Sequence, residues 1–525
     1  MIGDIRPVEA TDYNTVRASF IRFLTLGGDD RNPTHERGLR LVGAWVEAKL
    51  DLVGCEIQQL LQLSSCSFGG PITATNLRLH GLLDLSGSSI IKLNLEGAEV
   101  FGDVFLRNSF QSNGEVRLIG VHIDGDLDCS GALLKGNGGP ALIIDRAKIG
   151  GAVFLRAPFH AVGEVRLWGA KLYSELDCSG AILNGVTGDA LTLDGAEIGK
   201  DVIFNENFHS LGMVRLVNAK IAGNLVCKNA RFDSQNSFSL CCESMRVTGR
   251  FYLHDLLLPI RISLDHAQVG VLIDDEDAWW YGSHLNGFIY GSFGFSCYTD
   301  SARRVAWLNK QTSKHNVSDA DARFFLPQPW QQLKKVLREM GHSNDAAEVG
   351  IAYEKHQRLA GRKGGWYSPQ RWMHWLYGVL IGYGYRPMKL VRWMIAVWLF
   401  CSVIFWCAAV NGLMSPSNPL VFQNPAYAAC RSNWYFCETL PEEYTGFSPL
   451  AYSLDVILPV IDLQQENDWA PLIPTPISPW YKEWITFSAK HGVRIVLWIE
   501  IFFGWIGTVL LVAVVTGLAK STSES

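Results

Sequence analysis

Three arginines recur at intervals of 49 residues. Arg117, Arg166 and Arg215 occupy the second position of the segments VRLIG, VRLWG and VRLVN. The alternation in these segments predicts short strands whose apolar side chains point inward and whose arginines point outward. Evenly spaced guanidinium groups suit the phosphates of a polyanion, so the column is a candidate ligand track. The alternative interpretation is a solvated face on which these arginines pair with neighbouring acids.

Other side chains follow the same repeat. A second, shorter outward column is expected at Arg107 and Arg156, with outward acids at Asp126, Asp128, Glu175 and Asp177. Three cysteines are expected to stack inside as a thiol ladder, namely Cys129, Cys178 and Cys227. Small apolar packing explains these cysteines, because no pair of them has the spacing of zinc ligands, and no metal site is expected.

A basic stretch from Pro327 to Lys363 predicts a helical hairpin with Gly341 at its turn. Its cations include Lys334, Lys335 and Arg338, which are candidate ligand contacts. A basic segment before a membrane can act as an anionic-lipid contact, a positive-inside anchor or a lever for a ligand. All three roles remain open.

Two uncharged apolar runs near the end of the chain predict membrane spans. Trp393 to Met414 contains 22 residues without a charge, which is long enough to cross a bilayer. The second span runs from about Val493 to Leu518 and contains one acid, Glu500. An ionisable group in a span is a functional candidate, so Glu500 and Thr508 are candidate pore residues; the alternative is that Glu500 is hydrated near the outer interface. Small residues in this span predict helix association, namely Gly504, Gly507, Ala513 and Gly517.

Basic residues flank these spans and place both termini in the cytoplasm of a bacterial inner membrane. The loop between the spans then lies outside, where Cys430 and Cys437 are candidates for a disulfide. The segment SPLAYSLDVILPVIDLQQENDW in this loop is either a vestibule or re-entrant pore element or a packed outer cap. The N-terminal sequence has no signal-peptide pattern, so we expect the first 300 residues to stay in the cytoplasm.

The elements that position these residues follow from the repeat. The segments AEVFGDVFL, AKIGGAVFL and AEIGKDVIF start 49 residues apart, and a related pattern between them divides each period into steps of 23 and 26. Short alternating strands with Gly-containing corners at this period predict a β-helix solenoid. The predicted order is an N-terminal helical cap (1–37), the solenoid (38–275), a helical linker and hairpin (276–365), an interfacial aromatic helix (366–387), a first span (388–414), an extracytoplasmic loop (415–490), a second span (491–519) and a tail (520–525).

Composition agrees with a soluble module followed by a membrane module. The 525 residues are 48% hydrophobic and 18% charged, with a net charge of −5, and 12 of the 18 Trp follow position 365. These values exclude a disordered chain, a coiled coil and a generic binder of duplex DNA.

Several C-terminal motifs carry a resemblance. The solenoid repeat, QPWQQLKKVLREMGH, GYGYRP at 382–387, YSLDVILPVIDL at 452–463 and the closing GLAK resemble bacterial two-span membrane proteins related to pentapeptide-repeat proteins. These proteins are often labelled membrane-associated oxidoreductases. No dinucleotide, haem or flavin motif is present in the sequence, so we expect no cofactor and no enzymatic activity.

The architecture is also similar to that of the membrane effectors of Hailong anti-phage defence. That resemblance implies a tetrameric ion channel held shut by a single-stranded DNA oligomer that a partner nucleotidyltransferase makes. Two spans cannot enclose an aqueous path, but several copies can. The expected function is therefore an oligomeric channel controlled by an anionic ligand. The alternative is a membrane-tethered scaffold.

Overall fold

The computed structural model describes residues 5–29, 32–33, 35–234, 238–311, 325–365, 367–441, 444–473 and 488–515. The chain forms two compact units, residues 1–360 and 361–525, and each is described by itself. The predicted cytoplasmic tail at 520–525 lies outside the described residues.

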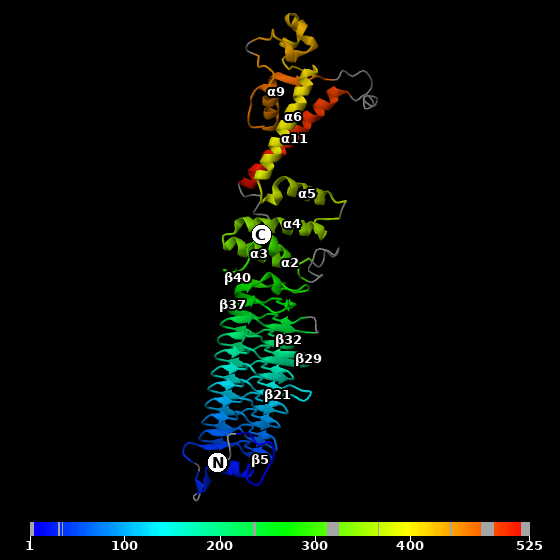
Figure 1. Cartoon of the computed structure of the whole chain (residues 1–525). Helices are drawn as coiled ribbons and strands as arrows, with labels where there is room; N and C mark the ends of the chain where they lie inside the picture. The colour runs from blue at the N-terminus through cyan, green and yellow to red at the C-terminus, as the bar shows by residue number, and fades with distance from the viewer. Residues whose placement is uncertain are drawn as a thin grey trace. The chain divides into compact units, whose positions relative to one another are not determined.

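The first unit contains a parallel β-solenoid of about 11 turns, residues 39–293 (Figure 1). A coil contributes four short strands, for example β14 (Leu93–Asn94), β15 (Glu99–Val100), β16 (Val104–Phe105) and β17 (Gln111–Ser112). Each strand pairs in parallel with its equivalents in the coils before and after it, as β15 does with β11 (Arg78–Leu79) and β19 (His122–Ile123). The predicted fold class is confirmed.

The register reproduces the two alternating steps of the sequence repeat. His122 pairs with Lys148 of β23 (Lys148–Ile149), and Lys148 pairs with Lys171 of β27 (Lys171–Leu172). Corners between strands require a left-handed residue, which Gly120 and Gly169 supply with φ values of 63° and 61°. The solenoid continues beyond residue 275, where the pattern predicted its end, because β39 (Gln268–Asp274) pairs with a further strand, β40 (Ile289–Phe293).

The solenoid interior is closely packed with apolar side chains. Cys129, Cys178 and Cys227 are all fully buried, as predicted. The three cysteines do not stack directly on one another as the predicted ladder requires. The register places Leu155 between Cys129 and Cys178, and Phe204 between Cys178 and Cys227. The 49-residue period covers two coils, so a repeated cysteine returns only in every second coil.

The N-terminal end of the solenoid is covered by a short strand and a helix. Strand β1 (Thr15–Arg17) pairs with β5 (Trp45–Glu47), and α1 (Ala18–Thr25) buries Ala18, Ile21 and Thr25. This covering satisfies the otherwise open edge of the first coil.

Helices α2 (Ser301–Leu308), α3 (Gln328–Glu339) and α4 (Ser343–Leu359) cover the C-terminal end of the solenoid (Figure 1). The side chain of Gln328 bonds the backbone of Gly287 and Phe288, and that of Gln332 bonds the carbonyl of Tyr290. Two of the three glutamines in the QPWQQL motif therefore form hydrogen bonds with polar backbone groups of the last coil, which has no following coil to bond them.

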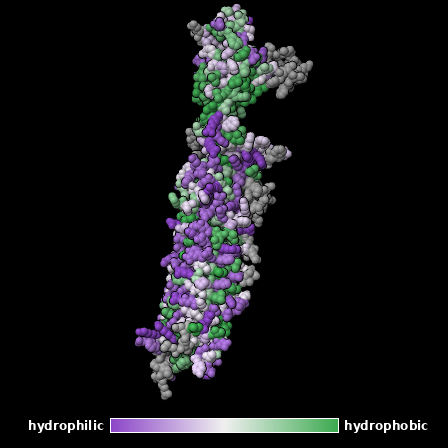
Figure 2. Space-filling view, in the orientation of Figure 1, coloured by the Kyte–Doolittle hydropathy of each residue, from purple (hydrophilic) through white to green (hydrophobic). Residues whose placement is uncertain are grey.

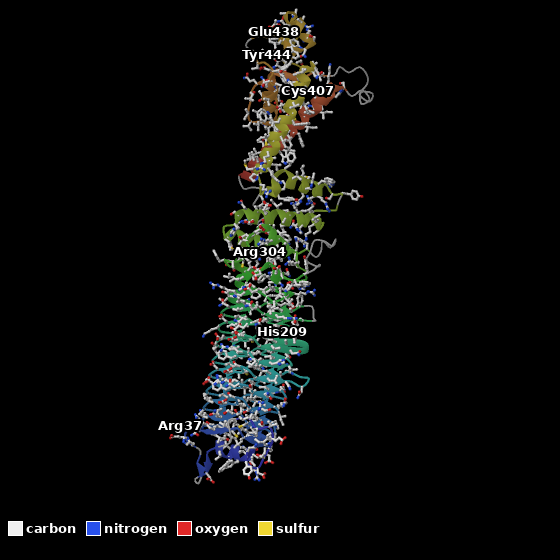
Figure 3. All side chains as sticks on the ribbon, in the orientation of Figure 1. Arg37, His209, Arg304, Cys407, Glu438 and Tyr444 are labelled. Atoms are coloured by element: carbon white, nitrogen blue, oxygen red, sulfur yellow. A yellow bond between two sulfur atoms is a disulfide. The ribbon has the colours of Figure 1, made fainter. Side chains whose placement is uncertain are left out.

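A buried ion pair fixes α2 to the same end. Arg304, labelled in Figure 3, donates from both terminal nitrogens to Asp274 of β39 at 2.9 Å. Its guanidinium lies 3.8 Å from the ring centroid of Phe293, and Trp279 donates to the same carboxylate. The Asp274 charge is thus buried with all its main partners in place.

The second unit contains two long apolar helices, α6 (Met388–Val410) and α11 (Ala489–Val515), preceded by the aromatic helix α5 (Pro369–Ile381). Between them come α7 (Pro419–Gln423), α8 (Pro449–Ile457), α9 (Gln465–Asp468) and a two-stranded sheet of β41 (Met414–Pro416) and β42 (Trp469–Pro471). Figure 2 shows apolar side chains gathered on the surface of this unit and polar ones on much of the solenoid.

Both α6 and α11 are long and apolar enough to cross a membrane. Only 28% and 17% of their most apolar stretches are buried, whereas the core helix of a soluble domain is largely enclosed. The exposed apolar faces therefore favour a lipid environment.

Candidate ligand groove and membrane site

The predicted arginine column is present, but its members are paired. Arg117, Arg166 and Arg215 lie two coils apart on one face, with Ile143 and Thr192 in the coils between. Their carboxylate partners are Glu115, Asp145 and Asp194, at 3.2, 2.6 and 2.7 Å respectively. The interpretation as a face of ion pairs therefore fits these arginines better than a free track.

The second column has the same character. Arg107 and Arg156 pair with Asp128 and Asp177, and each guanidinium lies 4.0 Å from the centroid of a phenylalanine ring. The two aspartates alternate with inward apolar residues as predicted, but they are buried beneath these arginines and do not face solvent. Each also accepts a hydrogen bond from a nearby backbone N–H, so the carboxylates stabilise the corners that follow them.

A different column of cations is exposed on another face of the solenoid. Lys148, Lys171, Glu197, Lys220 and Arg246 are paired from coil to coil and occupy consecutive coils. Coils are about 4.8 Å apart, so this column carries charge at twice the density of the arginine column. We call these five residues the basic ridge.

The basic ridge holds more positive charge than its single acid can neutralise. Glu197 bonds Lys220 at 2.9 Å and Lys171 at 3.0 Å, and these two ammonium groups lower the pKa of Glu197. Lys148 and Arg246 form no ion pair with any other described residue. The ridge therefore offers uncompensated cations to solvent.

A shallow groove of about 560 Å³ runs beside the basic ridge. Its lining includes the small residues Gly199 and Ala222 together with Tyr173 and Thr248. The Tyr173 side chain is 64% exposed, which leaves its ring available for stacking. Cations that follow a groove with an exposed aromatic ring are the usual elements of a site for single-stranded nucleic acid.

The sequence already contained the signal for the basic ridge. Its residues are the second letters of AKIG, AKLY, AEIG, AKIA and MRVT, which are copies of the repeat used to define the solenoid. Arg117, Arg166 and Arg215 are easier to recognise, because the same residue type recurs every 49 residues. A comparison of this second letter across the copies would have selected Lys148, Lys171, Lys220 and Arg246, with Glu197 between them.

The basic hairpin contributes fewer free cations than predicted. Lys334 is buried with 7% exposure, so its side chain does not face solvent as a ligand contact requires. Lys335 is exposed and lies 3.9 Å from Glu339, and Arg338 is exposed on the same helix. Packing of α3 on the last coil explains the burial of Lys334, because its aliphatic stem extends the apolar face formed by Leu333 and Leu337.

In the second unit, Glu500 is fully buried. The alternative prediction, that Glu500 is hydrated near the outer interface, does not fit this burial within one chain. Ser453 of α8 bonds one oxygen of the Glu500 carboxyl group, and the Cys401 thiol of α6 faces the same group as a weak donor. Thr508 is half-buried, two turns further along α11. Neither side chain lies on the most exposed face of the helix.

Helix α8 packs against both long helices. Tyr452 is in edge contact with Phe405 of α6, and the Ile457 carbonyl lies against Gly504 of α11. After α8 the chain turns back, and Asp455 holds the turn by accepting from the backbone N–H groups of Leu463 and Glu466. Asp455 is therefore a structural residue, and the short helix between two long ones fits either a re-entrant element or a packed cap.

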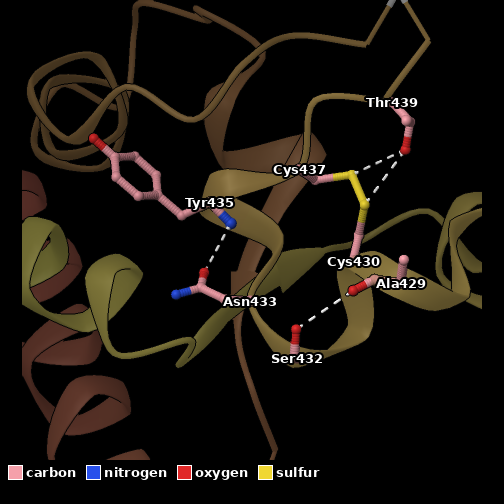
Figure 4. The surroundings of a disulfide bond; sticks show 7 residues. All are labelled: Ala429, Cys430, Ser432, Asn433, Tyr435, Cys437 and Thr439. Atoms are coloured by element: carbon pink, nitrogen blue, oxygen red, sulfur yellow. Dashed lines mark hydrogen bonds between the residues drawn. A yellow bond between two sulfur atoms is a disulfide. The ribbon is translucent and has the colours of Figure 1, made fainter.

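The predicted disulfide is formed between Cys430 and Cys437 (Figure 4). The hydroxyl of Thr439 lies 3.5 and 3.6 Å from the two sulfur atoms. The bond closes a short loop in which Asn433 accepts a hydrogen bond from the backbone N–H of Tyr435. A disulfide here agrees with an oxidising compartment for this segment.

One carboxylate–imidazole cluster outside these sites has ligand atoms close enough for a cation. His254, Asp255 and Asp275 lie together near the C-terminal coils. The Lys228 ammonium is 3.7 Å from Asp255, and the Asp255 N–H donates to Asp275. These contacts explain the cluster as an ion-pair network without a metal.

The fold and its sites define a class: a parallel β-solenoid joined to a unit with two helices able to cross a membrane. Comparison with protein-family models, curated proteins and solved structures finds no match. The function must therefore be argued from the chemistry of the groove and of the membrane unit.

Proposed function

We propose that this chain is the subunit of an oligomeric ion channel whose conductance is controlled by an anionic ligand on the solenoid. The observation that carries the proposal is the basic ridge beside a groove with an exposed tyrosine, in a chain that also has two helices suited to a membrane. The ligand class that fits is a single-stranded oligonucleotide, because phosphates match the cations and a base can stack on Tyr173.

The proposal assigns the conducting path to several copies of the chain. Two spans cannot surround water, whereas copies of α6, α8 and α11 around an axis can. The exposed apolar side chains of α6 and α11 face lipid or the next copy, among them Leu399, Phe400, Phe502 and Trp505. The sequence resemblance favours a tetramer in the bacterial inner membrane, and the basic residues that flank the spans favour cytoplasmic termini.

The proposed physiological role is anti-phage defence by membrane disruption, with a nucleotidyltransferase as the partner that makes the ligand. No catalytic step is assigned to this chain, and no cofactor is required. Control by the ligand needs only that it bind one state of the oligomer better than the other.

Planar-bilayer recording of the purified full-length protein tests the proposal. We expect the current to change when co-purifying nucleic acid is removed by nuclease, and to be restored by a mixed-sequence single-stranded oligodeoxynucleotide. A silent bilayer under both conditions would support the alternative, a membrane-tethered scaffold whose solenoid docks other proteins.

Charge reversal on the basic ridge tests where the ligand binds. The triple variant Lys148→Glu, Lys171→Glu, Lys220→Glu should lose oligonucleotide binding in a fluorescence-anisotropy titration. A single Lys→Ala change should make the slope of log affinity against log salt shallower by roughly 0.7 for each phosphate that the ridge no longer neutralises. Lys135→Glu is the matched control, because Lys135 is exposed on a different face of the solenoid. Equal effects of the control and the ridge variants would exclude the groove as the binding site.

A further inference from the structure

The surroundings of Glu500 contain acceptors and weak donors but no cation. Two groups face its carboxyl group, the Ser453 hydroxyl from α8 and the Cys401 thiol from α6. The Ser453 hydroxyl also contacts the Trp398 carbonyl of α6. Glu500 forms no ion pair within the part of the chain that the structure describes. Its Oε2 atom is buried without a hydrogen bond of normal geometry to a described residue.

Proton counting distinguishes the two charge states of this group. The Ser453 oxygen lies within hydrogen-bond distance of two oxygens, one of Glu500 and, at 3.0 Å, the Trp398 carbonyl. A hydroxyl has only one proton to donate. If Glu500 is ionised, Ser453 must donate to it, and its oxygen then faces the Trp398 carbonyl with no proton between them. If Glu500 is a neutral acid, it donates to Ser453, which donates to Trp398, and both contacts are satisfied.

The charges nearby act in the same direction. Asp455 on α8 and Glu466 on α9 are the other acids of this region, and Glu466 interacts with Glu500 electrostatically. Partial burial, followed by the carboxylates of Asp455 and Asp462, raises the pKa of Glu466 itself. An ionised Glu500 would therefore be buried near like charge and without a cationic partner among the described residues, which disfavours the ionised form.

We propose that Glu500, Ser453 and the Trp398 carbonyl form a proton-binding site in the membrane unit, in which Glu500 is a neutral carboxylic acid at neutral pH and docks α8 onto the two long helices. Release of the proton requires α8 to move, because only then does water reach the carboxylate. This inference goes beyond the proposed function and does not depend on conductance. It changes the role expected of Glu500 from a charged pore residue to a proton-dependent contact within one subunit.

Infrared difference spectroscopy of the full-length protein in lipid vesicles at pH 7 tests the charge state directly. The wild-type spectrum minus that of Glu500→Gln should contain the C=O stretch of a neutral carboxylic acid, and this band should shift in D₂O. In Ser453→Ala the band should remain but move, because its hydrogen-bond acceptor is absent. Glu438→Gln is the control: Glu438 is exposed in the outer segment (Figure 3), and its substitution should remove only carboxylate bands.

A stability measurement separates a proton site from a merely structural contact. Gln can donate to Ser453 as the neutral acid does and needs no proton from solution when the chain folds, so Glu500→Gln should melt at or above the wild-type temperature at pH 7. The wild type should lose thermal stability as the pH rises above the ordinary pKa of a glutamic acid, because the unfolded chain then releases the proton that the folded chain keeps, and the variant should lack this part of the pH dependence. Loss of carboxylate bands rather than an acid band in the Glu500→Gln difference spectrum, or the same pH profile in both proteins, would overturn the proposal.

Discussion

The guanidinium of Arg166 donates two hydrogen bonds to the carboxylate of Asp145, which lies in the preceding coil. Its Nε and Nη2 atoms are 2.9 and 2.6 Å from the Asp145 Oδ2 atom. The Asp145 side chain is only 9% exposed and also accepts from the backbone N–H of Trp168. The pair therefore links adjacent coils and compensates a nearly buried charge.

Removal of this guanidinium should destabilise the solenoid without affecting ligand binding. Arg166→Ala leaves Asp145 with one of its two partners, and removing a hydrogen bond to a charged group costs about 1.5–3 kcal/mol. We expect a lower urea midpoint, recovered in part by the double variant with Asp145→Asn, and no change for the exposed Lys135→Ala. Unchanged stability combined with weaker oligonucleotide binding would instead restore the arginine column as the ligand track.

The period alone was sufficient to predict the solenoid, because each coil repeats the same inward positions. It did not show which outward charges are free. The partner of Arg166 lies 21 residues earlier in the previous coil, so its pairing depends on the register and not on local sequence. The basic ridge was missed for a different reason: its residues differ between Lys, Glu and Arg, so no single residue type recurs along the column, and the register makes the column evident.

The surroundings of Glu500 could not be predicted from the sequence. Glu500 could be identified as an unusual acid in an apolar helix. Its partner Ser453 is 47 residues away with no periodic relation to it, and burial of the pair depends on the position of α8 between the long helices. The packing of a short helix in an irregular segment follows from tertiary contacts alone.

Acidification should weaken the helical cap at the end of the solenoid through His356 of α4. Its ring lies 4.6 Å from the Trp330 ring, and burial, followed by the charge of Lys355, lowers the pKa of His356. The unfolded chain binds a proton near pH 6.5 that the folded chain resists, so stability is present above that pH and falls below it. The slope for one such group is at most about 1.4 kcal/mol per pH unit.

Thermal unfolding measured from pH 7.5 to 5 checks this prediction. His356→Gln should flatten the decline, whereas His122→Gln, which replaces an exposed histidine on the solenoid, should leave it unchanged. A decline that is identical in the wild type and in His356→Gln would show that another group is responsible.

Thiol labelling of the native protein should spare four buried cysteines of the solenoid. Burial raises the pKa of Cys66 to about 11 and keeps the thiols of Cys129, Cys178 and Cys227 neutral and inaccessible. Since the thiolate is the reactive form, a maleimide at pH 7.5 should not modify them until the solenoid unfolds. Mass spectrometry of the native and urea-treated protein checks this, and rapid native labelling of any of the four would contradict the closed interior.

The disulfide cysteines report the orientation in the membrane. After mild reduction of intact cells, a membrane-impermeant maleimide should label Cys437, which is only partly buried, because the proposed topology places this segment outside. A variant with both changed to serine is the control for specificity. Labelling that appears only after the cells are permeabilised would reverse the proposed orientation.

Two glycines of α11 offer a matched test of the packing that positions Glu500. A Cβ atom at Gly504 would lie 2.3 Å from the carbonyl oxygen of Ile457, a backbone atom that cannot move without shifting α8. At Gly507 the nearest atom is the sulfur of Met394 at 3.3 Å, on a flexible side chain. Gly504→Ala should therefore separate α8 from α11, expose the Glu500 site to water and lower the melting temperature in detergent by several degrees. Gly507→Ala should have little effect or stabilise the helix.

In the infrared measurement, Gly504→Ala should convert the neutral-acid band of Glu500 to a carboxylate band at pH 7. Equal effects of the two alanines on melting temperature and spectrum would mean that close approach of α8 to α11 does not control the site.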